Sequence, residues 1–365
     1  MLYHYNSTSQ QHENQEAKMS CVRIKKLPLP EKIIRQYPLS SSGHEKVIQD
    51  REEIRRILDG RDNRLLIIVG PCSAWPKEAV FEYAKRLQML NIKLKKSLKI
   101  VMRMYIQKPR TTKGWTGPIN QPNPFSEPDI EAGMHYAREM MVKVVERGLP
   151  IADECLFTHN SRGFSELVSW FAIGARSSED HEHRIFASAA NCPVGLKNPT
   201  HGSIDVSVNS IVAAQSAHVA AMDGYEVKTL GNPHAHLVLR GANSAPNYSL
   251  EDLEMVQKNL EKQRIKNPAV LIDVSHDNCI IDGKKDHRTQ PETIFKVMKY
   301  LKNRPDLRRL MKGFMIESYL KEGNQKLESS NASTIDLNGL SITDPCLGWE
   351  QTEALLLKLS DEVKL

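Results

Sequence analysis

The chain has 365 residues, of which 40% are hydrophobic and 26% are charged, so it can bury a large core and has an ordinary globular composition. Its formal net charge of +6 comes from dispersed Lys and Arg residues, without a basic run or interleaved aromatics, which argues against nucleic-acid binding. No apolar stretch approaches the ~20 residues of a membrane span, and residues 1–20 lack a signal-peptide core, so we expect a cytoplasmic protein without a membrane partner.

The N-terminal part divides into a tail and an extension. Residues 1–20 are rich in Gln, Asn, Ser and His, which predicts a disordered tail. Residues 21–63 form the predicted extension. Prolines interrupt 22–38 and predict an irregular or edge segment, and the serines at 40–42 offer N-caps for an amphipathic helix over about 43–58.

Eight short apolar runs follow, and each ends abruptly at a polar or charged side chain. They are not alternating, which is typical of strands buried on both faces. The runs are 64–70, 98–102, 150–153, 171–175, 192–196, 236–239, 269–275 and 313–316. Eight such strands separated by helices predict an α/β protein with a (β/α)₈ TIM barrel over residues 64–365.

Helical patterns occupy the intervals between these runs. Apolar residues recur there at helical spacing, mostly after Asp, Ser, Thr or Pro signals of a helix start. The predicted helices are 78–94, 130–147, 164–170, a short one within 177–190, 204–214, 249–263, 291–302 and 350–358.

Four potential metal donors lie at the strand ends, where a barrel places its chemistry. Cys72, His276 and Glu317 each end a run, and Asp344 follows the eighth. Each alone is more readily explained as a buried thiol, a hydrogen-bonded histidine, a helix cap or an ion-pair partner. Together they favour one divalent ion, Mn²⁺, Fe²⁺, Co²⁺ or Zn²⁺, which accept thiolate, imidazole and carboxylate ligands.

Basic residues occupy most of the other strand ends. Cations gathered at one mouth repel one another unless they hold anions, and this set suits two phosphates or a phosphate plus a carboxylate. The alternative for any single one is a solvent-exposed side chain or an ion pair. The residues are Arg103, Arg176, Lys197 and Arg240 at strand ends, with Lys108 and Arg110 after the second strand and a lone carboxylate, Glu154, after the third.

These strand ends sit within motifs that resemble the type I 3-deoxy-D-arabino-heptulosonate-7-phosphate (DAHP) synthases. The resemblance runs in order along nearly the whole chain from about residue 22. It is carried by Gly70-Pro71-Cys72-Ser73, Met102-Arg103-Met104-Tyr105, Lys108-Pro109-Arg110-Thr111-Thr112, Gly174-Ala175-Arg176, Pro193-Val194-Gly195-Leu196-Lys197-Asn198, Leu239-Arg240-Gly241, Pro246-Asn247-Tyr248, Asp273-Val274-Ser275-His276, Glu317-Ser318, Glu322-Gly323-Asn324-Gln325 and Ile342-Thr343-Asp344-Pro345-Cys346-Leu347-Gly348-Trp349-Glu350.

The resemblance implies the first step of the shikimate pathway of aromatic amino acid biosynthesis. Phosphoenolpyruvate (PEP), erythrose 4-phosphate and water would give DAHP and phosphate, in a homodimer or homotetramer. The implied residues are the metal ligands Cys72, His276, Glu317 and Asp344; the PEP contacts Arg103, Lys108, Ala175, Arg176, Lys197 and Arg240; the erythrose 4-phosphate contacts Arg110 and Thr111; and the catalytic residues Lys108, Lys197, Glu154 and His276.

The chain departs from the family pattern mainly after Glu154. Feedback-regulated members carry an acidic residue and a Pro-Gln pair there, whereas this chain has Cys-Leu-Phe-Thr-His-Asn-Ser-Arg over 155–162. Asn191 replaces a serine, and the hairpin segment 213–236 looks shortened. We therefore expect weak or absent feedback inhibition by aromatic amino acids.

Two alternatives remain open at this point. A synthase of a 3-deoxy-octulosonate phosphate would carry Lys-Ala-Asn-Arg where this chain has Lys108-Pro109-Arg110-Thr111. A catalytically inactive barrel kept as a binding partner would have no need of the full set of donors and cations. Cys346, two residues after Asp344, is expected to be an inert thiol, and the alternative is an oxidative link to Cys72.

Overall fold

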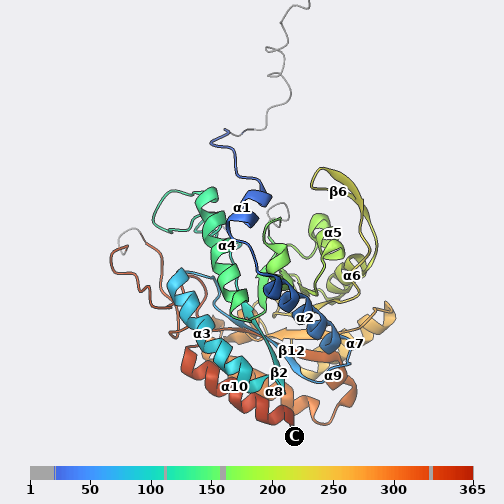
Figure 1. Cartoon of the computed structure of the whole chain (residues 1–365). Coiled ribbons are helices and arrows are strands. Elements are labelled where there is room, and N and C mark those ends of the chain that lie inside the picture. Colours follow the sequence, from blue (N-terminus) through green and yellow to red (C-terminus); the bar gives the residue numbers. More distant parts are fainter. Residues whose placement is uncertain (1–19, 21, 111–112, 157–161, 329–331, 365) are drawn as a thin grey trace, which may run out of the picture.

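Eight parallel strands close into a barrel, as the sequence predicts (Figure 1). The computed structural model describes residues 20, 22–110, 113–156, 162–328 and 332–364. In order around the barrel the strands are β1 (Leu65–Gly70), β12 (Met311–Glu317), β9 (Val270–Asp273), β8 (Ala235–Leu239), β5 (Val194–Lys197), β4 (Val168–Ile173), β3 (Ile151–Glu154) and β2 (Leu98–Arg103). The (β/α)₈ fold is therefore confirmed.

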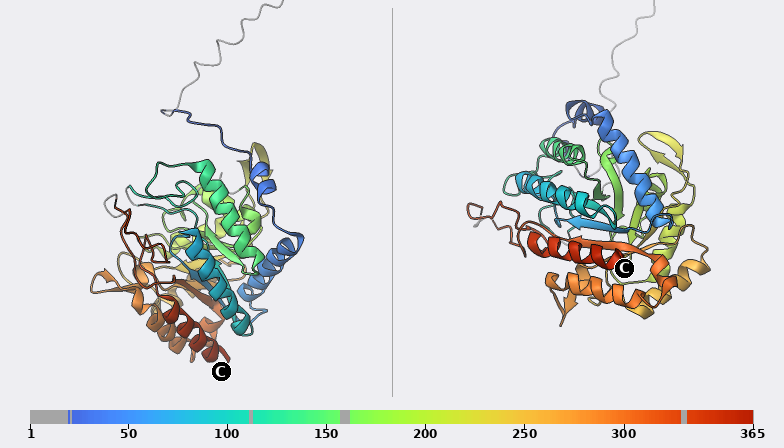
Figure 2. Two further views of the ribbon diagram at one scale, coloured as in Figure 1. Left: turned by 60° about the vertical axis from the view of Figure 1, so that its left-hand side comes forward. Right: turned by 60° about the horizontal axis from the view of Figure 1, so that its bottom comes forward.

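Helices cover the outside of the barrel, and α3 and α10 lie side by side there (Figures 1 and 2). Polar N-caps start several of them; the Ser249 and Asp252 side chains, for example, form a reciprocal capping box. The outer helices are α3 (Lys77–Leu94), α4 (Ile130–Glu146), α5 (His181–Ala189), α6 (Ile204–Gln215), α7 (Leu250–Lys262), α8 (Gln290–Leu301), α9 (Pro305–Leu310) and α10 (Trp349–Lys364).

The predicted helix over 164–170 is wrong. A single 3-10 turn, η2 (Ser165–Leu167), leads directly into β4, which begins three residues before the predicted run. Val168 and Trp170 are fully buried within the sheet, so tertiary burial decides their conformation. The short helix α9 was not predicted.

The barrel interior is filled by inward-facing side chains from alternate strand positions. Leu66, Val101, Trp170, Val238 and Met315 belong to one buried cluster there. Large and small residues alternate there. Position 195 is a glycine, and a Cβ on it would lie only 2.2 Å from the Trp170 ring, so the large Trp170 side chain needs the small residue beside it. The barrel is thus a packed core, and polar inward positions are concentrated at its two ends.

The N-terminal extension closes one end of this core. The segment expected to be irregular contains a short helix, α1 (Pro30–Gln36), and α2 (Ser41–Leu58) follows. Ile54, Ile57 and Leu58 of α2 join the interior cluster. Residues 1–19 lie outside the described residues, so the disorder of the tail stays a prediction.

Lys99 links α2 to the barrel wall. It lies on β2 and is 5% exposed, and its Nζ is 2.6 Å from Asp50 Oδ1 and 2.9 Å from Glu53 Oε2, both on α2. Two carboxylates therefore surround one buried ammonium at this end of the barrel.

Two small hairpins extend beyond the barrel. The segment expected to be shortened nevertheless forms an antiparallel pair, β6 (Val219–Met222) and β7 (Tyr225–Lys228). A second pair, β10 (Ile280–Ile281) and β11 (Lys284–Lys285), follows the short turn η3 (His276–Cys279) after β9. Among the described residues, no helix has the length and apolar character needed to cross a membrane.

Candidate active site

A strongly basic cavity of about 300 Å³ opens at the C-terminal ends of the barrel strands. Most of the predicted substrate residues line it. The lining comprises Lys108, Pro109, Arg110, Lys113, Glu154, Ala175, Arg176, Lys197, Thr200, Arg240, His276, Lys285 and Asp344. Cys72, Arg103 and Glu317 are buried. Cys72 and Glu317 contact the lining residues Lys108 and His276, and Arg103 pairs with Glu317 behind them. Thr111 lies outside the described residues.

Three of the four predicted metal donors converge beside this cavity. One ligand atom each of Cys72, Glu317 and Asp344 lies within 4.8 Å of the others, and the Cys72 Sγ is 3.4 Å from Asp344 Oδ2. Asp344 comes from the loop after β12. These residue types suit a first-row divalent ion.

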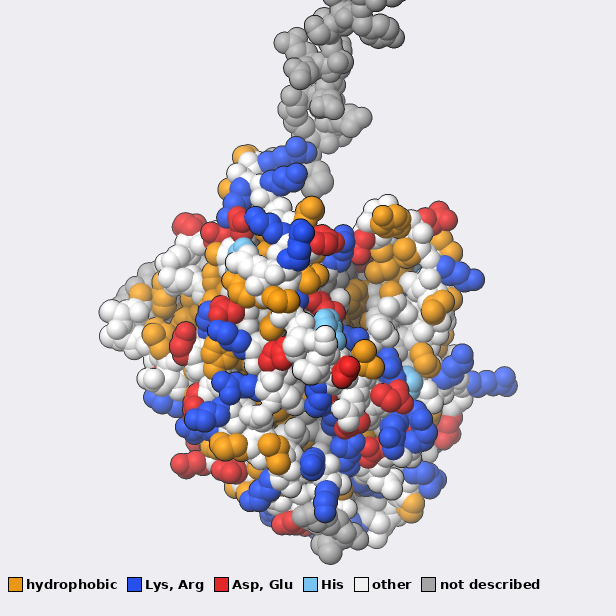
Figure 3. Space-filling model, viewed as in Figure 1, with side chains coloured by type: hydrophobic (Ala, Val, Ile, Leu, Met, Phe, Trp, Pro, Cys, Tyr) orange, Lys and Arg blue, Asp and Glu red, His pale blue; other side chains and the backbone are white. Residues whose placement is uncertain are grey.

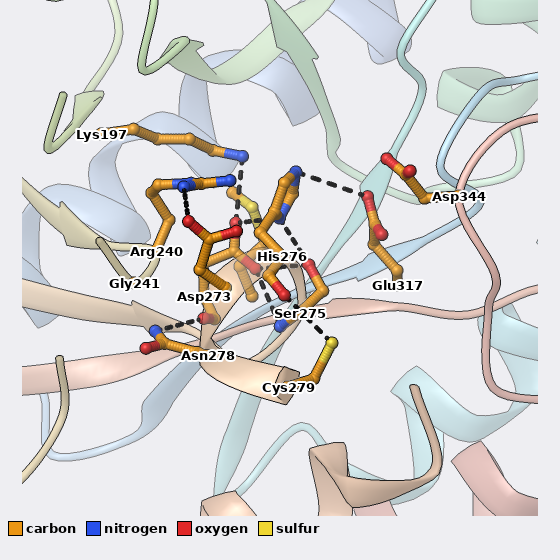
Figure 4. Close-up of polar contacts among 12 residues, drawn as sticks. Lys197, Arg240, Gly241, Asp273, Ser275, His276, Asn278, Cys279, Glu317 and Asp344 are labelled. Carbon is orange, nitrogen blue, oxygen red and sulfur yellow. Dashed lines mark hydrogen bonds and ion pairs between the residues drawn. The ribbon is translucent and has the colours of Figure 1, made fainter. Parts of the chain in front are cut away.

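His276 lies next to this group with one ring nitrogen already engaged (Figure 4). Its Nδ1 is 2.7 Å from Ser275 Oγ and 3.0 Å from Asp273 Oδ2, whereas its Nε2 is 4.0 Å from Glu317 Oε1. Hydrogen bonding at Nδ1 fixes the ring so that Nε2 faces the donors, the usual arrangement of a metal-binding histidine. The backbone φ of His276 is +54°, a costly conformation outside glycine that is common at functional sites.

The ammonium of Lys108 interacts with the same donor group. Its Nζ is 2.6 Å from Cys72 Sγ and 3.3 Å from Asp344 Oδ2. Burial opposes its charge, but Cys72, Asp344 and Glu317 outweigh burial and raise the pKa of Lys108. Burial, followed by the Glu317 charge, raises the pKa of Cys72 to about 12. A metal ion would therefore displace a proton from this thiol on binding.

Three other basic strand ends, Arg103, Lys197 and Arg240, are each paired with a carboxylate. Arg103 Nη2 is 3.1 Å from Glu317 Oε1, and Lys197 Nζ is 3.0 Å from Asp273 Oδ2. Arg240 Nη1 donates to Asp277 Oδ2 at 2.7 Å. The Nη1 of Arg103 is buried and has no hydrogen-bond partner among the described residues, so this nitrogen can donate to a ligand.

Asp273 is a buried residue of this candidate site that the strand-end interpretation missed. It is fully buried at the end of β9 and contacts both Lys197 and His276 (Figure 4). Burial alone would raise its pKa, but His276 and Lys197 outweigh burial and hold the pKa well below its usual range. The sequence could have indicated Asp273, because it lies two residues after Leu271, which faces the barrel interior, and side chains two residues apart on a strand point to the same face.

Glu154 reaches the cavity past a glycine. A Cβ at position 174 would lie 2.1 Å from Glu154 Oε1, so Gly174 provides the space for this carboxylate. Its neighbour Asp153 has a different role: the Oδ1 accepts hydrogen bonds from the backbone N–H groups of Glu154 (2.9 Å) and Ile106 (3.2 Å). Asp153 thereby anchors the segment that leads to Lys108.

The five described cysteines are free, including the buried Cys72 and Cys346. The inertness of Cys346 stays a prediction. Cys346 Sγ lies 3.6 Å from the backbone oxygen of Asp344.

A closed parallel barrel with metal-type donors and a basic cavity at its C-terminal ends has the arrangement of a barrel enzyme's active site. The comparisons with known proteins then specify the family. Residues 38–357 match the DAHP synthetase I family, and the chain belongs to it.

Curated relatives cover almost the whole chain. The Tyr-sensitive phospho-2-dehydro-3-deoxyheptonate aldolase of Salmonella typhimurium is 40% identical over 342 residues, 92% of this chain and 93% of that protein. The Trp-sensitive enzyme of Escherichia coli is 38% identical over 357 residues, 96% of this chain and 99% of that protein. A solved structure of the aldolase from Francisella tularensis has a TM-score of 0.86 and 35% identity, covering 94% of this chain and 98% of that one. The chain is an enzyme of this type.

Proposed function

We propose that the chain catalyses, in the cytoplasm, the metal-dependent condensation of PEP with erythrose 4-phosphate and water to give DAHP and phosphate. The observation that carries the proposal is the basic cavity adjoining the Cys72, Glu317 and Asp344 donor group. Such a cavity suits substrates with three anionic groups: two phosphates and one carboxylate.

PEP would bind to the cations at the strand ends. Arg103, Arg176, Lys197 and Arg240 can hold its phosphate and carboxylate, next to the backbone of Ala175. The pairing of Lys197 with Asp273 and of Arg240 with Asp277 keeps these cations oriented across the mouth. Preorganised charges of this kind stabilise a transition state without reorganisation.

Erythrose 4-phosphate would bind with its phosphate at Arg110 and Thr111 and its aldehyde toward Lys108. The PEP methylene carbon attacks the aldehyde carbon, and a carbon–carbon bond forms. Lys108, whose Nζ lies 2.6 Å from Cys72 Sγ and 3.3 Å from Asp344 Oδ2, would donate a proton to the aldehyde oxygen, which becomes a hydroxyl. Water, oriented by Glu154 and Lys197, adds to the central PEP carbon. The bond from that carbon to the phosphate oxygen then breaks, and phosphate leaves.

Cys72, His276, Glu317 and Asp344 would hold one divalent ion, Mn²⁺, Fe²⁺, Co²⁺ or Zn²⁺. When bound, such an ion supplies Lewis-acid polarisation of the aldehyde carbonyl. The position of Nε2 of His276 supports its role as the fourth ligand and as a residue that contacts the reacting end of the sugar.

A steady-state assay tests the proposal. After EDTA treatment, PEP-dependent phosphate release with erythrose 4-phosphate should disappear, and a divalent ion should restore it. Faster turnover with a pentose phosphate would favour the octulosonate phosphate alternative. Binding of PEP without turnover in any metal would favour an inactive barrel.

We also propose weak or absent feedback inhibition. The curated relatives are named Tyr-sensitive and Trp-sensitive, but this chain differs from the regulated pattern after Glu154. A cavity of about 740 Å³ beside the β6–β7 hairpin carries Arg55, Arg162 and Asn191 in its wall. Phe, Tyr or Trp at millimolar concentration should leave the initial rate nearly unchanged; strong inhibition by any of them would contradict this proposal.

Assembly into a homodimer or homotetramer is a third part of the proposal. Hydrophobic side chains gather over the β6–β7 hairpin and the N-terminal segment (Figure 3), and Ile24 and Leu230 are 94% and 89% exposed. Two such apolar surfaces on one chain are suited to burial against another copy. Light scattering coupled to size-exclusion chromatography measures the mass directly, and a monomer at micromolar concentration would contradict assembly.

A further inference from the structure

A second basic cavity lies at the opposite end of the barrel from the active site. Its volume is about 650 Å³, and it shares no lining residue with the active-site cavity. It lies where α9, the end of α2 and the starts of β1, β9 and β12 meet (Figure 1). The lining comprises Leu58, Asp59, Gly60, Asp62, Asn63, Arg64, Asn267, Pro268, Arg308, Arg309, Met311, Lys312 and Val363.

The two carboxylates of this cavity already have arginine partners. Asp62 accepts hydrogen bonds from Arg64 Nε at 3.0 Å and Nη2 at 2.6 Å. Asp59 accepts from Arg61 Nη2 at 2.7 Å. Neither carboxylate forms an ion pair with the remaining cations of the lining.

Arg308 and Lys312 are the unmatched charges. Both are half-buried, and within the described part of the chain neither has an ion pair or a side-chain hydrogen bond. A Cβ at position 60 would lie 3.5 Å from Lys312 Nζ, which places this ammonium against the Gly60 backbone. Exposed Arg309 adds a third cation.

Two neighbouring cations that are partly removed from water destabilise each other. Burial lowers the pKa of Arg308. Burial followed by the Arg308 charge lowers the pKa of Lys312, and the Asp59 charge offsets only part of this effect. A bound anion removes this repulsion and provides acceptors for the unused donors. A guanidinium and an ammonium together match the oxygens of a phosphate group.

We propose that this cavity is a binding site for a small phosphorylated molecule, whose phosphate is held by Arg308 and Lys312. Leu58, Pro268 and Met311 supply an apolar wall for the remainder of the ligand. Asn63 adds an amide. The volume is within the range of small-molecule sites. The site is separate from catalysis, because it lies at the end of the barrel that carries no catalytic residue.

Calorimetric titration of the full chain with pyrophosphate tests the site. The probe has the required chemistry and is small enough for the cavity. The Arg308→Gln/Lys312→Gln variant removes the two proposed contacts, and Lys258→Gln/Lys299→Gln removes the same charge from exposed helix positions as the matched control. The wild type and the control should each bind one more pyrophosphate per chain than the Arg308/Lys312 variant. Equal stoichiometry and affinity in all three proteins would overturn the proposal.

Thermal unfolding gives an independent measurement. Without pyrophosphate, the Arg308/Lys312 variant should have a Tm equal to or above that of the wild type, because it removes a repulsion. With pyrophosphate, the Tm of the wild type should rise by more than that of the variant. A lower Tm of the variant without ligand would show that the two cations have partners within the protein, and would overturn the proposal.

Discussion

The cluster around Lys99 at one end of the barrel and the active-site cavity at the other bury charge in opposite ways. At the end closed by α2, Lys99 is surrounded by Asp50 and Glu53, and the ammonium is enclosed. At the open end, seven basic side chains and two carboxylates line one cavity. Around Lys99 the protein supplies the counter-charges itself, whereas the lining of the active-site cavity has more basic side chains than carboxylates and can accept anionic ligands.

This difference separates structural from functional ion pairs in one molecule. Lys99 connects β2 to α2, so its pairing positions the helix that closes the core. Lys197 and Arg240 are paired as well, but they remain in the wall of a cavity and can interact with a substrate. A buried charged group does not by itself indicate function. An excess of basic over acidic side chains in the wall of an open cavity does indicate a binding site for anions.

The open end is tested most strongly at Lys197. Lys197→Met should lower kcat/KM by about 10³-fold, because the variant loses a preorganised charge at the PEP site. Phosphate release at varied PEP concentrations measures the effect. Lys113→Met is the matched control, because Lys113 is an exposed lysine of the same cavity and should lose far less activity. Equal losses of kcat/KM in the two variants would show that Lys197 contributes only positive charge to the cavity and has no specific role at the PEP site.

The closed end is tested at Lys99. Lys99→Met should lower the free energy of unfolding by about 3 kcal/mol, because it leaves the buried Asp50 and the half-buried Glu53 without this partner. The kcat/KM of the folded fraction should stay at the wild-type value. Denaturant unfolding and the activity assay measure the two quantities, and Lys99→Met/Asp50→Leu should recover part of the stability. If Lys99→Met lost activity without losing stability, Lys99 would have a role in catalysis and not the structural role given to it above.

The donor group of the open end is tested by its thiol. Cys72→Ser should weaken metal binding by at least about 100-fold, because second-shell losses alone reach that size. Metal content after dialysis against a dilute chelator measures the loss. Cys346→Ser removes a buried thiol that is not in the donor group and should keep its metal. Retention of a full equivalent of metal by Cys72→Ser would exclude Cys72 as a ligand.

The smallest expected effect concerns Asp153, which holds the backbone next to the active-site cavity but does not line the cavity. Burial raises the pKa of Asp153 to about 8. Between its ordinary pKa of 3.8 and about 8, the folded protein binds a proton that the unfolded chain lacks, so its contribution to stability falls as pH rises through this window. Asp153→Asn should remove this slope and raise the Tm relative to wild type by a few degrees at pH 8.5.

Asp62 is the control of opposite sign. Burial alone would raise the pKa of Asp62, but its hydrogen bonds with Arg64 outweigh burial and lower it. Its contribution is present above the ordinary pKa and is lost as the pH falls toward the lowered value. Asp62→Asn should therefore lower the Tm at neutral pH, and the deficit should shrink toward pH 3. If the Tm difference from wild type changed with pH in the same direction for both variants, the assignment for Asp153 would be contradicted.

Much of the fold could be predicted because parallel strands buried on both faces give continuous apolar runs. All eight strands overlap the predicted runs. Short elements could not be predicted in this way: α1 and α9 span one to two turns, and the apolar residues of 164–170 fit a helix or a strand equally well.

The candidate site was predicted where strand ends and apolar runs coincide. Arg103, Glu154, Lys197 and Glu317 are the last residues of their strands, and all four lie in or beside the cavity. Asp273 was missed because the apolar run was extended to residue 275, whereas β9 ends at Asp273 itself. Asp277 gave no periodic signal, because its role depends on the approach of Arg240 from a neighbouring strand.

The closure of the barrel by α2 also affects how the chain folds during its synthesis. Ile54 and Ile57 pack in the same cluster as Met315 of β12, so α2 leaves the ribosome more than 250 residues before its packing surface is complete. Until then its apolar face must stay exposed or be held by a chaperone. Slowed translation within residues 60–310 should therefore increase aggregation of nascent chains, whereas slowed translation after β12 should not.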